Sequence, residues 1–143
     1  MSDEAGQDRG PHPQVLDIEQ ATLGNDTYRT AVWTGTHLQL TVMSIEPGGE
    51  IGLEVHEDHD QFLRVESGRG RVQMGPAKDE LTLDREVGDD WAILVPAGSW
   101  HNLTNVGEEP LKLYSLYAPR EHAHGTVHRT KAEADAAEHV DSS

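Results

Sequence analysis

Short apolar runs separated by turn residues make up the central part of the chain. From Val15 onward, turn signals such as Pro47-Gly48-Gly49 interrupt these runs about every ten residues. Runs of this length, rich in β-branched and aromatic residues, predict strands rather than helices. The predicted strands lie at residues 29–33, 38–45, 61–65, 70–74, 80–83, 91–95, 101–105 and 111–117. Many short strands at regular spacing predict an all-β sandwich or barrel.

The two ends of the chain lack this pattern. Residues 1–13 are rich in Gly, Pro and acidic residues without an apolar period, which predicts a disordered N-terminal arm. Near the other end, Thr130 and Glu133 have the spacing of a capping box ahead of an alanine-rich segment, which predicts a short helix. We therefore expect a barrel domain at residues 14–120, followed by a C-terminal loop, short helix and disordered tail at residues 121–143.

Alternation along two predicted strands separates an inner face from an outer face. Gln61, Leu63 and Val65 lie on one side of their strand, because successive side chains point to opposite faces. By the same argument, His101 and Leu103 share a face. A few polar groups beside apolar residues are typical of a small-molecule pocket, so we expect these side chains to point into the barrel.

Two histidine-bearing segments carry candidate metal ligands. Glu54 and His56 are separated by one residue, so on extended backbone both side chains lie on the same side and can hold one ion. A helical pair would need a spacing of three or four residues. The second segment contributes His101, which follows Pro96 and Gly98. The spacing therefore predicts a metal site within a sheet.

These segments resemble the two motifs of the cupin superfamily. The first motif corresponds to the stretch from Gly48 to Gly68. Within it, Glu54 and His56 take the positions of two histidines, and Gln61 takes the position of a glutamate. Glutamate in place of histidine and glutamine in place of glutamate both alter the metal site itself.

The second motif corresponds to residues 90–105. Pro96, Gly98, His101 and Asn105 match it, while Asp90 replaces a glycine at a turn where Asp is tolerated. Together the two segments cover the central third to half of the chain. The resemblance implies a double-stranded β-helix, also called a jelly-roll barrel, with a metal at the barrel mouth.

The resemblance implies four metal ligands: Glu54, His56, Gln61 and His101. Two histidines and one carboxylate suit one divalent transition metal, and Fe, Mn, Zn and Ni all remain open. His59 is an alternative to Gln61 as the fourth ligand. A metal-free barrel is also open, in which Glu54 forms an ion pair with an arginine and His101 is a hydrogen-bonded core histidine.

Three further histidines, His122, His124 and His128, follow the last predicted strand. They could belong to an ordinary surface loop or form a second ion site. A third interpretation is that the loop folds across the barrel mouth. In that case His122 and His128 are candidate catalytic residues, because a histidine titrates near neutral pH and can act as a general acid or base.

Composition narrows the range of partners. The chain has 143 residues, a net charge of −15 and no cysteine. The negative charge argues against binding to nucleic acid or to anionic membrane surfaces. No apolar run could span a bilayer and the acidic start is unlike a signal peptide, so a cytoplasmic location is expected. The resemblance to small cupins implies a homodimer, with the apolar strand at residues 38–45 as the candidate interface. The alternative is that this strand is wholly internal to the barrel.

The resemblance also implies two classes of function. The first is a metal-dependent enzyme of the isomerase, dioxygenase or lyase type that acts on a small oxygenated metabolite, anionic ones included. The second is a non-catalytic cupin module that binds a small molecule or a metal in the same pocket. Because one fold supports many activities, the choice depends on the site. The sequence identifies no substrate.

Overall fold

The chain folds into two antiparallel sheets with a helix near each end. The computed structural model describes residues 7–141, and their side chains through residue 137. The strands are β1 (Arg29–Thr34), β2 (Gln39–Ile45), β3 (Asp60–Ser67), β4 (Gly70–Gly75), β5 (Leu83–Val87), β6 (Ala92–Val95), β7 (Trp100–Asn105), β8 (Leu111–Ala118) and β9 (Val127–His128). The helices are α1 (Ile18–Leu23) and α2 (Lys131–Asp141).

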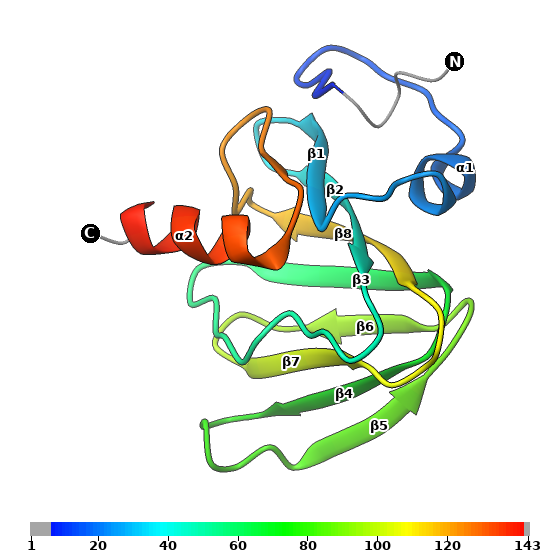
Figure 1. Ribbon diagram of the computed structural model, residues 1–143. Helices are drawn as coiled ribbons and strands as arrows, with labels where there is room; N and C mark the ends of the chain where they lie inside the picture. The colour runs from blue at the N-terminus through cyan, green and yellow to red at the C-terminus, as the bar shows by residue number, and fades with distance from the viewer. Residues whose placement is uncertain (1–6, 142–143) are drawn as a thin grey trace.

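The order of the strands confirms the predicted jelly-roll barrel. The larger sheet has the order β6-β3-β8-β2-β1-β9, and the smaller sheet has the order β5-β4-β7. Strands from distant parts of the chain are neighbours, as β3 and β8 are, and as β4 and β7 are (Figure 1). All-β architecture and a short C-terminal helix are both as expected from the sequence.

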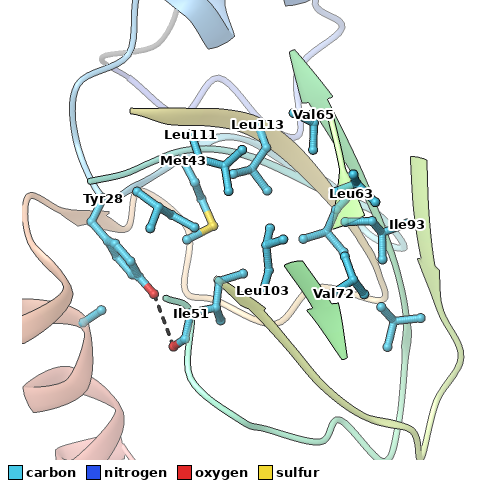
Figure 2. Packing of buried hydrophobic residues seen from close by; sticks show 14 residues of the cluster. Tyr28, Met43, Ile51, Leu63, Val65, Val72, Ile93, Leu103, Leu111 and Leu113 are labelled. Carbon is cyan, nitrogen blue, oxygen red and sulfur yellow. Dashed lines mark hydrogen bonds between the residues drawn. The ribbon is translucent and has the colours of Figure 1, made fainter. Parts of the chain in front are cut away.

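The apolar core lies between the two sheets. Leu63 and Val65 on β3 and Leu113 on β8 point toward Val72 on β4 and Leu103 on β7 (Figure 2). All five side chains are at most 3% exposed. Burying one such side chain stabilises the fold by about 1.5–3 kcal/mol. The core therefore fixes the position of one sheet relative to the other. It thereby also fixes the polar residues that the two sheets carry at one end of the barrel.

Cross-strand rows on the inner face of the larger sheet change from apolar to polar along the strands. Residues directly opposite each other on antiparallel strands share a face. One row is apolar and consists of Val65, Leu113 and Met43. Another row is polar and consists of Gln61, Tyr117 and Gln39. The predicted inward alternation along β3 is confirmed, since Gln61, Leu63 and Val65 are 4%, 2% and 0% exposed.

The fifth predicted strand, at residues 80–83, is wrong. Ala77 and Glu80 close a turn there, with the Glu80 N–H donating to the Ala77 carbonyl at 3.0 Å, and β5 begins only at Leu83. β5 is an edge strand with almost no buried side chain, so it lacks the apolar alternation of a half-buried strand. Its side chains instead pair with β4, as in the bidentate contact of Arg71 with Asp84 at 2.6 and 2.9 Å.

For the strand at residues 38–45, the structure shows the alternative to a dimer interface, a strand internal to its sheet. β2 hydrogen-bonds to β1 on one side and to β8 on the other, so it is an internal strand. An internal strand has no free hydrogen-bonding edge to offer a second chain. Dimer formation itself stays a prediction, without this strand as its hydrogen-bonding edge.

Both ends of the described chain pack against the barrel. Of the predicted N-terminal arm, residues 1–6 lie outside the described residues, while the Arg9 N–H donates to the Val32 carbonyl on β1 at 3.1 Å. At the start of α2, the Glu133 N–H donates to the Thr130 hydroxyl oxygen at 3.2 Å. The Thr130 hydroxyl thus caps the helix as the sequence predicts, while the Glu133 carboxylate accepts from the Arg129 N–H, one residue before the cap, at 3.0 Å.

Candidate metal centre

A main-chain bridge places Glu54 beside His101. The Glu54 N–H donates to the His101 carbonyl at 3.0 Å, and the His101 N–H donates to the Glu54 carbonyl at 2.9 Å. Residues that exchange both hydrogen bonds in an antiparallel pair have side chains on the same face. As a result, Glu54 Oε2 lies 3.5 Å from His101 Nε2. His101 is 4% exposed and Leu103 3%, so both point inward as predicted.

His56 completes a group of three potential ligands. Its Nε2 atom lies 3.4 Å from Glu54 Oε2, although residues 55–56 are not part of a regular strand. The Gly98 N–H donates to the His56 carbonyl at 2.8 Å and fixes the backbone there. The ligand atoms of Glu54, His56 and His101 all lie within 4.8 Å of one another.

The separations within this group fit a coordinated metal ion. Nitrogen and oxygen ligands lie about 2.1 Å from zinc, so two ligands at a tetrahedral ion are about 3.4 Å apart. The two distances to Glu54 Oε2 are 3.4 and 3.5 Å. His101 Nδ1 lies 3.1 Å from the Ser99 carbonyl, which can only accept, so Nδ1 carries the proton and Nε2 keeps its lone pair. In a neutral His101 this leaves the Nε2 lone pair facing the Glu54 carboxylate, an arrangement that a cation between the two would stabilise, so these three residues could hold a metal.

Gln61 and His59, the two candidates for the fourth ligand, differ in their surroundings. The Gln61 Nε2 atom lies 3.4 Å from the Ser115 hydroxyl, while its buried Oε1 accepts no hydrogen bond from residues 7–141. His59 stacks on His56, with ring centroids 4.6 Å apart, and its Nε2 lies 3.2 Å from Glu121 Oε1. His59 therefore belongs to a second group, with His56 and Glu121, and Gln61 Oε1 is the acceptor that stays open on the inner face.

The loop after β8 folds back toward the site. The His122 Nε2 atom lies 3.4 Å from the Tyr117 hydroxyl. The Tyr117 ring meets the His56 and His59 rings edge-on, with centroids 6.2 and 5.9 Å apart. The His128 ring lies 6.5 Å from the His122 ring. This arrangement corresponds to the interpretation in which the loop crosses the barrel mouth.

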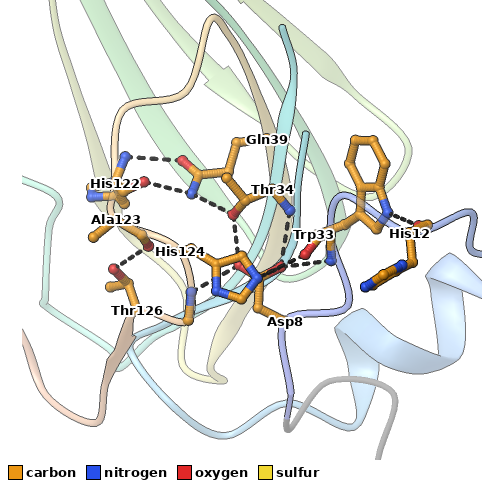
Figure 3. Close-up of polar contacts among 11 residues, drawn as sticks. Asp8, His12, Trp33, Thr34, Gln39, His122, Ala123, His124 and Thr126 are labelled. Carbon is orange, nitrogen blue, oxygen red and sulfur yellow. Dashed lines mark hydrogen bonds and ion pairs between the residues drawn. The ribbon is translucent and has the colours of Figure 1, made fainter. Parts of the chain in front are cut away.

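His124 has a different place from the other two C-terminal histidines. Its Nε2 atom lies 2.8 Å from the Gly10 carbonyl and 3.4 Å from an Asp8 carboxylate oxygen (Figure 3). His124 therefore contacts the N-terminal segment. His122 and His124 thus have different partners, the Tyr117 hydroxyl for the first and the N-terminal segment for the second.

Burial and neighbouring charges shift the pKa values at the site. For Glu54, burial opposes ionisation, but contacts with His101 and His56 outweigh it and hold the pKa of the carboxyl below its usual range. Burial lowers the pKa of His59, and the charge of His56 adds to that effect. Burial also lowers the pKa of His122 to about 2 and raises the pKa of Tyr117 to about 12. His122 and Tyr117 are therefore both uncharged at neutral pH.

An ion pair between Glu54 and Arg64, one form of the metal-free alternative, is not what the structure shows. Arg64 contacts Glu66 at 2.6 Å and Asp90 at 2.8 Å. Glu54 instead contacts His56 and His101.

Tyr117 and Glu121 were not foreseen from the sequence. Tyr117 ends the strand predicted at residues 111–117, and Glu121 lies in a loop with no alternation to orient it. The one signal that could have pointed to them is the neighbouring cluster of C-terminal histidines.

Comparison with known proteins assigns the family. A family model of the cupin domain matches residues 41–117. The protein YrkC of Bacillus subtilis (strain 168) is 60% identical over 131 residues, which cover 92% of this chain and 70% of YrkC. A protein of Acanthamoeba polyphaga mimivirus is 36% identical over 114 residues, covering 79% of this chain and 69% of its own length.

A solved structure shows the same architecture. The crystal structure of BH2720 from Bacillus halodurans superposes with a TM-score of 0.90 at 60% identity, covering 91% of this chain and 98% of BH2720. Within residues 7–141, no helix is long and apolar enough to cross a membrane. The motifs, the barrel and these relatives agree: the chain belongs to the cupin family.

Proposed function

We propose that Glu54, His56 and His101 hold one divalent transition metal at the barrel mouth, with Gln61 as the fourth protein ligand. The observation that carries this proposal is the group of three ligand atoms within 4.8 Å of one another, two of whose separations match the edges of a coordination tetrahedron. The Ser99 carbonyl adds support, because by accepting the Nδ1 proton of His101 it leaves Nε2, 3.5 Å from Glu54 Oε2, for a metal ion.

The donor set restricts the metal and the ligand. Two imidazoles and one carboxylate suit Fe, Mn, Zn or Ni, and such an ion supplies Lewis-acid and template chemistry for a substrate with adjacent oxygen atoms. One carboxylate against a divalent ion leaves the occupied site positive, and the neutral amide of Gln61 does not change that. We therefore propose that the ligand is a small oxygenated metabolite, with anions favoured over cations.

The residues around the ion fit an enzyme of the isomerase, dioxygenase or lyase type. Tyr117 keeps its proton at neutral pH and can donate a hydrogen bond to a bound oxygen. His122 is uncharged at neutral pH and so does not act as a general acid there, and its Nε2 can donate to the Tyr117 hydroxyl oxygen when that hydroxyl donates to a bound oxygen. His128 remains the candidate acid or base on this loop, 6.5 Å from the His122 ring.

Metal analysis and calorimetry test the proposal. Protein purified under mild conditions should hold about one divalent transition metal per chain. His56→Ala and His101→Ala should each lose it, whereas His59→Ala should keep it. His37→Ala, which changes an exposed histidine away from the site, is the matched control. Full metal retention by the His101 variant would refute the assignment.

A substrate panel then separates the enzyme from the binding module. Metal-loaded protein would be incubated with small hydroxy acids, keto acids and sugars, and the products followed by NMR. Turnover that disappears in His101→Ala supports the enzyme. Metal-dependent ligand binding without turnover across the panel supports a non-catalytic cupin module instead.

A further inference from the structure

Glu121 lies beside His56, one of the proposed metal ligands, on the side of its Nδ1 atom. We propose that it is a positioning residue of the metal centre, which orients His56 and selects its tautomer, and that the N-terminal segment around Asp8 holds it in place. This inference rests on the proposed function, because it concerns how a metal ligand is prepared for its ion.

The position of Glu121 Oε1 is what suits it to this role. It lies 3.6 Å from His56 Nδ1 and 3.2 Å from His59 Nε2. The first separation is an electrostatic contact slightly longer than a hydrogen bond. A carboxylate on this side favours the proton on Nδ1, so that the Nε2 lone pair points to the other side, where Glu54 lies at 3.4 Å. Ser99 does the same for His101 through its carbonyl oxygen.

The side-chain amide of Gln39 fixes the loop segment that carries Glu121. Gln39 lies on β2 with 0% of its surface exposed. Its Oε1 accepts from the Glu121 N–H at 3.2 Å and from the His122 N–H at 2.9 Å, and its Nε2 donates to the His122 carbonyl at 2.8 Å. Figure 3 shows Gln39 and His122 facing each other across these contacts. Three hydrogen bonds to two successive residues leave this backbone little freedom.

Asp8 extends this network to the N-terminal segment. The Gln39 Nε2 donates to the Thr34 hydroxyl at 3.0 Å, and that hydroxyl donates to Asp8 Oδ2 at 2.6 Å. The Asp8 side chain is 1% exposed and also accepts from the Thr34 N–H at 3.0 Å and the Gly125 N–H at 2.9 Å (Figure 3). The loop is therefore held at two points, by Gln39 near Glu121 and by Asp8 at Gly125.

A second metal ion is the competing explanation for the same cluster. The ligand atoms of His56, His59 and Glu121 lie within 4.8 Å of one another. To bind two ions at once, His56 would have to coordinate through both ring nitrogens and so give up both protons, since a metal ligand must be deprotonated. One carboxylate oxygen that faces two imidazoles is simpler to explain as an electrostatic contact that orients the rings. The geometry thus favours positioning over a second site.

The test compares Glu121→Gln with Glu108→Gln, which changes an exposed glutamate in the turn before β8. Removal of a carboxylate that orients a ligand histidine typically costs 10–100-fold in metal affinity, so calorimetric titration of the apo proteins with Zn should show a loss of about that size for Glu121→Gln only. Asp8→Asn should weaken binding in the same direction by a smaller factor. Nitrogen-15 NMR of the apo protein should show the His56 Nδ1–H tautomer decrease in Glu121→Gln.

The outcomes separate this inference from the proposed function. If wild-type protein binds no metal, the proposed function fails and this inference fails with it. If wild-type protein binds one ion that needs His101, and Glu121→Gln binds it equally tightly with an unchanged His56 tautomer, the positioning role alone is refuted. Two ions per wild-type chain, one of them lost in Glu121→Gln, would overturn it in favour of a second site.

Discussion

His122 should make the stability of the metal-free protein depend on pH. Burial, and then the charge of Arg29, lower the pKa of its imidazole from 6.5 to about 2. In the unfolded chain the imidazole takes up a proton as the pH falls below its ordinary pKa, whereas in the folded protein it stays neutral. The unfolded state therefore binds more protons in this range, so the free energy of unfolding falls as the pH falls.

The size of the effect follows from the same shift. A pH of about 5 is about 1.5 units below the pKa of the imidazole in the unfolded chain, whereas the imidazole in the folded protein is still unprotonated at that pH. Each unit is worth about 1.36 kcal/mol, so His122 should lower the free energy of unfolding by about 2 kcal/mol between about pH 7.5 and pH 5. His59, whose pKa is also lowered, acts in the same direction. A variant of His122 is needed to isolate its share.

Urea unfolding of chelator-treated wild type and His122→Gln measures that share. Glutamine keeps a hydrogen-bonding group for Tyr117, and the main-chain bonds of residue 122 to Gln39 do not depend on its side chain. Wild type should lose about 2 kcal/mol more than the variant on going from about pH 7.5 to pH 5. Equal losses would show that the imidazole is protonated in the folded protein as well, and would refute the reasoning.

Three further predictions follow from the site, the core and the assembly. Gln61→Glu adds a second carboxylate and should tighten binding of Zn or Mn in calorimetry of the apo protein; an unchanged affinity would place Gln61 outside the ligands. Leu113→Ala, at a position 0% exposed, should lower the free energy of unfolding in urea by about 2–5 kcal/mol. By comparison, Arg71→Ala, at an exposed ion pair, should lower the free energy of unfolding far less, and similar losses in both would contradict the assigned core. Light scattering at micromolar concentration should give twice the 15.7 kDa chain mass, and a monomer mass would count against the dimer.

The all-β class could be predicted from the regular spacing of short strands, and the family resemblance implied the barrel topology. Side chains on a strand alternate between its two faces, so a polar residue two positions from a buried apolar residue of β3 or β7 points to the same inner face. That argument correctly turned Gln61 and His101 inward. The pairing of Glu54 with His101 came from the family resemblance, and the structure supplies its physical cause in the main-chain bridge.

β5 and Glu121 could not be predicted for a common reason. β5 has charged residues at three successive positions, and its position depends on pairing with β4, where Arg71 meets Asp84. Glu121 reaches His56 only because Gln39, more than 80 residues earlier in the chain, holds its backbone. Contacts between distant segments leave no periodic signal in either segment alone. Reading one stretch of sequence at a time therefore misses both.

The bridge between Glu54 and His101 also bears on the lifetime of the folded protein. These residues are 47 positions apart, and bringing them together in an unfolded chain costs loop-closure entropy. An ion held by both therefore binds the folded state and stabilises it by mass action. We expect this contact between a loop and a sheet edge to form after the main folding barrier has been crossed. A bound ion would then slow unfolding while leaving the refolding rate almost unchanged. The metal would therefore determine the lifetime of the folded barrel and not its rate of formation.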